Sequence, residues 1–292
     1  MTFQAVTRQV FSLYRDRDYA AALAVAIDAR SSFPAEDNTL TFWEACLLAR
    51  LGERDRSVQT LLAGIERGQW WPTGKLVDHD LDPVRDHPGW AAVLAHCEAM
   101  TERLRANRPA PMVRGGSGDG TVVTIQGAHA VQEDFFATWD RALPGRWTLI
   151  TPVASEPTGD GPWEWPHSVE ASAEVVVADL LDFDLAPPLI LAGFSAGSAI
   201  AGHLILSGEL EVEGLISIAP WTRRDFDELV EASLVMPTLV ICGADDSLIS
   251  VDKLRSRVKG EDGQVELQVV DGLGHEHPMD LAQRVARFLE GL

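Results

Sequence analysis

The sequence predicts an α/β protein with three layers and a doubly wound, mostly parallel sheet, preceded by a smaller all-α helical-repeat domain. Apolar residues recur at helical spacing up to about residue 106, whereas beyond it short valine, isoleucine and leucine runs alternate with helical segments. The pentapeptide Gly193-Phe194-Ser195-Ala196-Gly197 joins one such run to a helix-like stretch. We expect a helical domain over 1–106, a linker over 107–120 and the α/β domain over 121–292.

Composition excludes several classes of function. The chain has 292 residues, 46% of them hydrophobic, and a formal net charge of -20. Such a charge, with only three lysines and no basic stripe, disfavours nucleic acid and anionic lipid as partners. We see neither a signal-peptide pattern nor an apolar run long enough to span a membrane, so we expect a cytoplasmic protein. Three widely spaced cysteines in apolar surroundings indicate reduced, buried thiols.

Four amphipathic segments make up most of the first domain, and we expect each to form a helix. They cover Phe3–Tyr14, Tyr19–Ser32, Thr39–Leu51 and Asp55–Gly68, and a further helix is expected over Pro88–Arg105. Asp18-Tyr19-Ala20 and Asp55-Arg56-Ser57 occupy matching points 37 residues apart. This pattern resembles a tetratricopeptide-type repeat with two units, and the resemblance covers about residues 5–68. The prolines and glycines of 107–120 predict a linker or loose hairpin.

Six apolar runs predict the strands of the second domain, with helices between most of them. The strands are expected at Thr121–Gln126, Trp147–Pro152, Pro188–Gly193, Gly214–Ala219, Thr238–Cys242 and Val265–Val270. Strands that are apolar on both faces and separated by helices indicate a parallel sheet covered on both sides. In such sheets the functional loops follow the carboxyl ends of the strands.

The pentapeptide predicts a nucleophile. A strand that turns at once into a helix forces the intervening serine into a strained backbone conformation and brings its neighbours close to the adjacent strand and helix. Gly193, Ala196 and Gly197 supply the small residues that such a turn requires. We therefore expect Ser195 to present its hydroxyl above the edge of the sheet.

An acid and a base follow in the chain order that a Ser-Asp-His triad requires. Asp245 and Asp246 come directly after a strand that ends in glycine, and the residues alone leave both open as the acid. His275 follows the last strand and is the expected base, because Gly274 allows its backbone to approach a neighbouring loop. His277 is the alternative base.

An oxyanion that develops during acyl transfer needs two backbone donors. We expect one from the N–H of Ala196 and the other from Ala128, since Gly127 allows the preceding loop to fold tightly. His129 is expected at the rim rather than as a second base. The long proline-rich segment 151–167 predicts a wall of the acyl pocket. The expected pocket residues are Gln126, His129, Phe194, Trp163 and Trp165.

These motifs together resemble the α/β-hydrolase superfamily, most of all its compact phospholipase/carboxylesterase branch. The resemblance covers about residues 120–290 and rests on Gln126-Gly127, Gly193–Gly197, Gly243–Asp246 and Gly274-His275. It implies esterase or thioesterase activity on small acyl substrates, with Ser195 as nucleophile, Asp246 and His275 as partners, and Ala128 and Ala196 as oxyanion donors. The chain departs from the pattern because glutamine replaces the usual histidine before Gly127, and because the first two strands are missing or reduced to the linker.

A serine hydrolase acting on a small-molecule ester is therefore the leading hypothesis, and no cofactor or metal is expected. A non-catalytic adaptor is the alternative, in which the helical repeat binds a protein partner or mediates self-association while the α/β domain serves as a scaffold. Peptidases and C–C hydrolases use the same triad. The natural substrate does not follow from the sequence.

Overall fold

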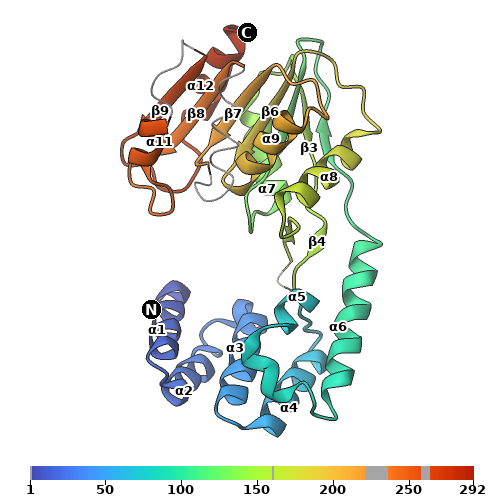
Figure 1. Ribbon diagram of the computed structural model, residues 1–292, viewed down its shortest axis with the longest axis vertical. Coiled ribbons are helices and arrows are strands. Elements are labelled where there is room, and N and C mark those ends of the chain that lie inside the picture. Colours follow the sequence, from blue (N-terminus) through green and yellow to red (C-terminus); the bar gives the residue numbers. More distant parts are fainter. Residues whose placement is uncertain (1, 160, 221–235, 258–263) are drawn as a thin grey trace. The chain divides into compact units, whose positions relative to one another are not determined.

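A computed structural model describes residues 2–159, 161–220, 236–257 and 264–292 (Figure 1). The chain divides into two compact units. The helical unit comprises Met1–Asn107 together with the short segment Pro157–Gly161, and the sheet unit comprises Arg108–Glu156 and Pro162–Leu292. The polypeptide therefore passes between the units three times.

The helical unit is built around one helix that is buried on most of its surface. Its elements are α1 (Phe3–Arg15), α2 (Tyr19–Ala29), η1 (Pro34–Glu36), α3 (Asp37–Arg50), α4 (Arg54–Glu66), α5 (Thr73–Leu76), η2 (His79–Val84) and α6 (Trp90–Arg105). In α3, Leu40 and Leu48 pack into a core with α1 and α2, whereas Ala45 and Cys46 pack into a second core with α4 and α6. A helix that is apolar on opposite faces must be covered on both.

The four helices expected over residues 3–68 are present, with ends that differ by up to three residues. The side chains of Thr2 and Asp18 cap α1 and α2 by accepting hydrogen bonds from the backbone N–H groups of Ala5 and Ala21. Threonine and aspartate are common at this position because their side-chain oxygens can accept such bonds. The relation to tetratricopeptide repeats stays a prediction. The sequence does not predict the short elements α5 and η2, because one or two turns give too few residues for a periodic pattern.

The sheet unit holds a seven-stranded sheet of order β1-β3-β2-β6-β7-β8-β9. Its strands are β1 (Met112–Arg114), β2 (Thr121–Ile125), β3 (Thr148–Thr151), β6 (Leu189–Phe194), β7 (Gly214–Ile218), β8 (Thr238–Gly243) and β9 (Val265–Val270), and a separate pair joins β4 (Glu156–Pro157) to β5 (Trp163–Glu164). β1 is antiparallel to β3, and the other pairings in the large sheet are parallel. The six expected strands are confirmed to within one residue at each end.

Helices cover both faces of this sheet (Figure 1). They are α7 (Gln132–Ala142), α8 (Val169–Leu180), α9 (Ala196–Ser207), α11 (Val251–Arg257) and α12 (Leu281–Glu290). Val122 packs with α7 and α12, whereas its neighbour Val123 packs with α8 and α9, as the alternation of side chains along a strand requires. The predicted three-layer arrangement is thereby confirmed for the described residues.

The strand order reverses direction at β2. The chain passes from β2 to β3 on one side and then crosses to β6 on the other, so β2 and β6 are neighbours from which the sheet grows both ways. Loops that follow the carboxyl ends of two such strands diverge and leave a crevice between them. In this chain those loops begin at Gln126 and Ser195.

The expectation of a linker over 107–120 is wrong in part, because this stretch contains β1. Arg114 explains why a three-residue strand is held there. Its guanidinium donates to the backbone carbonyls of Asp140, Leu143, Pro144 and Trp147 at 2.9 to 3.2 Å. A planar group with five donors can serve several carbonyls at once, whereas an apolar side chain in this edge strand could not.

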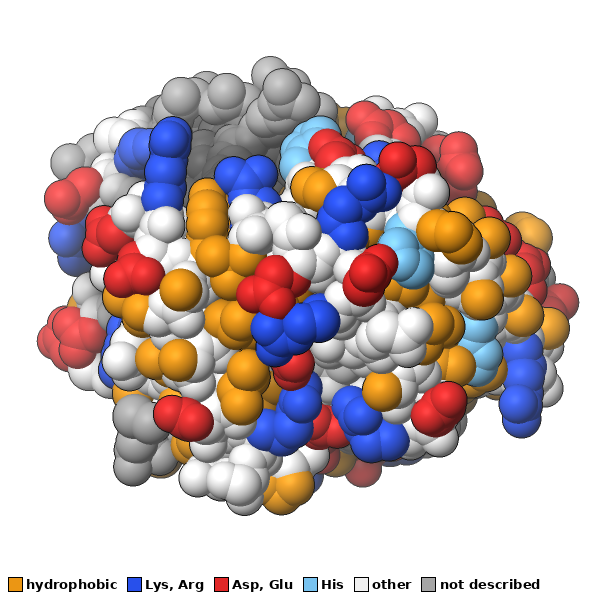
Figure 2. Space-filling model, turned by 90° about the horizontal axis from the view of Figure 1, so that it is seen from below, with side chains coloured by type: hydrophobic (Ala, Val, Ile, Leu, Met, Phe, Trp, Pro, Cys, Tyr) orange, Lys and Arg blue, Asp and Glu red, His pale blue; other side chains and the backbone are white. Residues whose placement is uncertain are grey.

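No helix among the described residues is both long enough and apolar enough to cross a membrane. Cys46, Cys97 and Cys242 are buried and form no disulfide. On the face drawn in Figure 2, basic and acidic side chains lie interspersed rather than gathered by sign.

Replacing Arg114 with alanine is expected to lower the free energy of unfolding by about 2 kcal/mol, because four carbonyls then lose a charged donor. Chemical denaturation checks this. Arg146→Ala is the control, since the Arg146 side chain is 74% exposed and pairs with Asp119 at the surface, and we expect a change below about 0.5 kcal/mol. Equal effects of the two substitutions would contradict the role given to Arg114.

Candidate active site

Ser195 lies between β6 and α9 in a backbone conformation that residues other than glycine rarely adopt. Its φ is 52° and its ψ is -116°. A Cβ on Gly193 would lie 2.5 Å from the backbone of Gly197, and one on Gly197 would overlap the carbonyl oxygen of Ile125 in β2. The close approaches predicted for the two glycines are confirmed, and they are what allows the tight turn.

Hydrogen bonds hold this turn in place. The Ser195 N–H donates to the carbonyl of Ile218 in β7 at 2.9 Å, and the Ser198 hydroxyl donates to the carbonyl of Gly193 at 2.9 Å. Strain of about 1–3 kcal/mol persists only where the surrounding structure enforces it. Here the two neighbouring strands and the first turn of α9 enforce it.

Ser195, His275 and Asp246 form one hydrogen-bonded chain. His275 Nε2 lies 3.0 Å from the Ser195 hydroxyl oxygen, and its Nδ1 lies 2.8 Å from Asp246 Oδ2. The second carboxylate oxygen of Asp246 accepts the backbone N–H groups of Leu248 and Ile249 at 2.8 and 3.0 Å. The Asp246 side chain is fully buried, so these donors replace the water that a carboxylate requires.

Asp245 was the other candidate for the acid, and the structure separates the two neighbours. Asp245 is exposed, and its backbone N–H donates to the carbonyl of Leu273. The carboxylate that faces His275 is that of Asp246.

The loop that carries His275 passes very close to the end of β8. A Cβ on Gly243 would overlap the carbonyl oxygens of Leu273 and Gly274. By contrast, the space around Gly274 is open and its φ is not positive. The expectation that Gly274 permits this approach is therefore wrong. The glycine that permits it is Gly243, at the end of β8.

Gly127 brings the loop after β2 against Ser195. A Cβ at this position would lie 3.2 Å from the Ser195 Cβ and 2.8 Å from a ring carbon of Phe194. Ala128, an expected oxyanion donor, follows directly. Ala196, the other expected donor, is the first residue of α9.

The five expected pocket residues have different surroundings. Gln126 is fully buried and donates to the carbonyl of Trp163 at 3.2 Å, so it holds the loop rather than lining an open pocket. Trp165 is buried, donates to the Gln126 carbonyl at 2.9 Å and lines a cavity of about 160 Å³ beside Ala196. Trp163 is half-buried.

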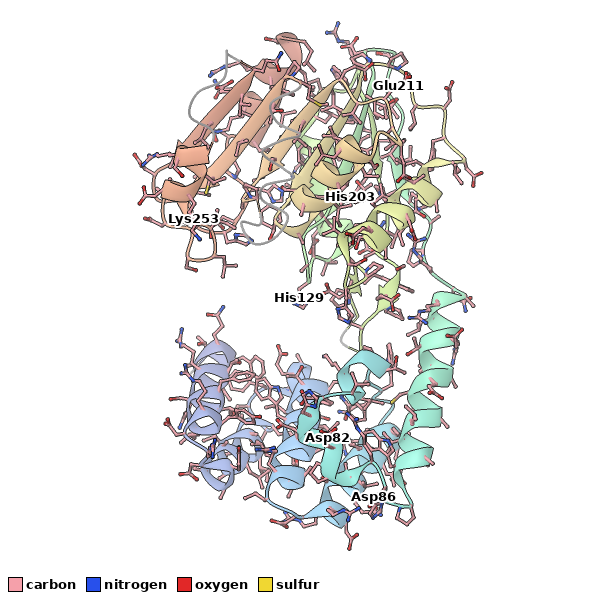
Figure 3. All side chains as sticks on the ribbon, viewed as in Figure 1. Asp82, Asp86, His129, His203, Glu211 and Lys253 are labelled. Atoms are coloured by element: carbon pink, nitrogen blue, oxygen red, sulfur yellow. The ribbon has the colours of Figure 1, made fainter. Side chains whose placement is uncertain are left out.

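His129 lies on the loop that follows β2 (Figure 3), and its side chain is 87% exposed. Its expected position at the rim of a pocket stays a prediction. Its Nδ1 lies 2.7 Å from a carboxylate oxygen of Glu164. Sequence reasoning missed Glu164, because no pattern links it to a loop 35 residues away.

Phe194 contacts both histidines of the last loop. Its ring stacks on His277 with centroids 4.5 Å apart and lies 5.2 Å from the ring of His275. Burial lowers the pKa of His277 to about 4, so this ring is neutral at pH 7. His277, the alternative base, therefore packs behind Phe194, and the imidazole that reaches Ser195 is His275.

The described residues contain no group of three or more histidine, cysteine, aspartate or glutamate side chains placed to hold a metal ion.

Known proteins resemble the chain at low identity. No protein-family model matches it. Lipase LipV from Mycobacterium tuberculosis is 28% identical over 168 residues, which cover 56% of this chain and 59% of the lipase. The match thus spans about three fifths of that relative.

Two solved structures show the same fold. An uncharacterized protein from Bacillus cereus matches with a TM-score of 0.53 and 20% identity over 100% of this chain and 99% of its own. Esterase PE8 matches with a TM-score of 0.51 and 21% identity, covering 63% of this chain and 99% of the esterase. With the mostly parallel seven-stranded sheet, these likenesses give the chain an α/β-hydrolase fold.

The depressed pKa of His277 makes stability depend on pH. Between about 4 and the ordinary value of 6.5, the unfolded chain binds a proton that the folded chain does not. The contribution of neutral His277 to the free energy of unfolding is fully present above pH 6.5. It falls by on the order of 2 kcal/mol as the pH decreases towards 4. Urea denaturation at pH 7 and pH 4.5 should show a smaller acid loss for His277→Phe than for the wild type. His79→Gln, at a side chain 96% exposed, should leave the loss unchanged.

Proposed function

We propose that this protein is a serine hydrolase that cleaves a carboxylic ester or thioester of a small molecule through an acyl-enzyme. The observation that carries the proposal is the chain of hydrogen bonds from Ser195 through His275 to Asp246, with the serine on a strained strand-to-helix turn. The names of two similar proteins, a lipase and an esterase, support ester hydrolysis.

In the first half of the reaction, Ser195 Oγ attacks the acyl carbon while His275 Nε2 accepts the hydroxyl proton. The tetrahedral intermediate then expels the alcohol or thiol, which takes that proton from the imidazolium. In the second half, His275 removes a proton from water, the hydroxide attacks the acyl-enzyme, and Ser195 leaves as the proton returns to it. The products are the carboxylic acid and the alcohol or thiol.

Asp246 determines the tautomer of His275. Its buried carboxylate accepts from Nδ1, so Nε2 stays free of hydrogen in the resting state and can accept the serine proton. The N–H groups of Leu248 and Ile249 hold the carboxylate in that orientation. The negative charge then stabilises the imidazolium that forms during attack.

The N–H groups of Ala128 and Ala196 serve as the oxyanion hole in this proposal. Ala196 begins α9, whose unpaired N–H groups carry partial positive charge, and Ala128 lies one residue beyond the contact of Gly127 with Ser195. Both donors belong to the backbone, so the glutamine that replaces the usual histidine at position 126 removes neither of them.

The nucleophile is tested by labelling. A fluorophosphonate should attach covalently to wild-type Ser195, as located by peptide mass spectrometry, and Ser195→Ala should abolish both labelling and hydrolysis of p-nitrophenyl acetate. Ser207→Ala is the control, because this exposed residue is the last of α9, away from the turn that holds Ser195, and its hydroxyl donates to the Leu204 carbonyl within the helix. Wild-type protein that neither labels nor turns over any acyl ester, yet captures a stoichiometric protein partner, would support the adaptor alternative instead.

Asp246→Asn tests the acid. The amide presents its N–H₂ or its oxygen to His275 without the negative charge, which favours the wrong tautomer, and we expect kcat to fall by on the order of 10⁴. Asp245→Asn should change kcat by less than about threefold, because that carboxylate is exposed and does not face His275. Steady-state kinetics on the same ester compares the neighbours, and equal losses would refute the assignment.

A further inference from the structure

We propose that Glu164 is a positioning residue that holds the loop bearing the Ala128 oxyanion donor. The proposal rests on the hydrolase function given above. Its basis is that three consecutive residues, Trp163, Glu164 and Trp165, make hydrogen bonds to the two residues that flank Gly127 and Ala128. We call Trp163–Trp165 the brace.

The first attachment of the brace is at Gln126. The Gln126 side chain donates to the Trp163 carbonyl, and the indole N–H of Trp165 donates to the Gln126 carbonyl. Gln126 is fully buried and its bond with Trp165 is buried as well, so water has little access to this attachment. The start of the loop is therefore fixed.

The second attachment is at His129, whose φ is 59°. This left-handed conformation is uncommon for a residue with a Cβ, and contacts from outside the residue help to hold it. Glu164 Oε1 supplies one: it accepts the backbone N–H of His129 at 2.8 Å and lies 2.7 Å from the imidazole Nδ1.

The backbone bond is the more important of the two. A carboxylate acceptor strengthens a hydrogen bond from an N–H group, and the Glu164 side chain is only 21% exposed. The imidazole is 87% exposed, so its pairing with Glu164 is screened by water and worth little. Glu164 therefore acts chiefly on the path of the main chain at His129.

Ala128 lies between these two fixed points, directly after the contact of Gly127 with Ser195. Donors aimed at a developing charge are effective when they need no rearrangement during the reaction. The N–H of Ala196 receives its orientation from α9, whereas that of Ala128 has only the loop to orient it. Loss of Glu164 should therefore weaken one of the two donors.

The test compares Glu164→Ala, Glu164→Gln and His129→Ala with the control Glu174→Ala, an exposed glutamate of α8. Glu164→Ala should lower kcat for p-nitrophenyl acetate by roughly 10- to 100-fold, because a displaced donor loses part of the stabilisation that a deleted one loses. KM should change by less than about threefold. Glu164→Gln keeps an acceptor for the N–H and should recover part of the loss, and His129→Ala should cost less than Glu164→Ala.

Two further readouts separate positioning from general damage. Affinity for a boronic acid, which forms a tetrahedral adduct with serine, should fall in proportion to kcat/KM. The pH at which activity declines on the acid side should not move, because His275 and Asp246 are untouched. Amide hydrogen exchange in peptides covering 126–131 should become faster in Glu164→Ala, while the unfolding midpoint changes little.

The outcomes distinguish this proposal from the proposed function. Unchanged kcat and unchanged exchange in Glu164→Ala would overturn the role of Glu164 and leave the hydrolase intact. Absence of labelling and turnover in the wild type would overturn the hydrolase, and the exchange of 126–131 would then still decide whether Glu164 holds the loop.

Discussion

The approach of α9 to the backbone of β2 is the constraint on which the site depends. At Gly197 the helix lies so near the Ile125 carbonyl that no Cβ fits between them. The chain must therefore turn within one residue after β6, and that residue takes a positive φ. The same proximity brings Gly127, two residues beyond β2, into contact with Ser195. Ser195 and the loop that bears Gly127 are thus neighbours because of one backbone packing contact.

Much of this fold is readable from the sequence, for reasons that differ between elements. The parallel strands are apolar on both faces and stand out as runs, so their bounds could be predicted closely. β1 escaped prediction because it has only three residues, none of them fully buried, and because the arginine that anchors it acts through carbonyls elsewhere. β4 and β5, with two residues each, offer no pattern at all.

The candidate site could be predicted from the sequence where its arrangement depends on the order of residues along the chain. It could not be predicted where the arrangement depends on the direction in which a side chain points. Ser195 and His275 follow from the glycine pattern and the strand ends, but adjacent carboxylates look alike until the turn after β8 is known. That turn aims one oxygen of Asp246 at Leu248 and Ile249 and the other at His275. The sequence gives no signal for Glu164 because the group that it chiefly holds is a backbone N–H, and backbone donors are the same at every residue except proline.

The segment Pro157–Gly161 has a consequence for how this protein can be dissected. It belongs to the helical unit, where Gly159 lies so close to the Trp70 carbonyl and the Asn38 amide that a methyl group could not be added, yet only Pro162 separates it from the brace. A shortened protein that starts after Asn107 would keep this segment but lose Trp70 and Asn38. The helical unit therefore cannot be removed by deleting the N-terminal residues alone. A truncated protein used for comparison should also have the segment Pro157–Gly161 replaced with a short turn.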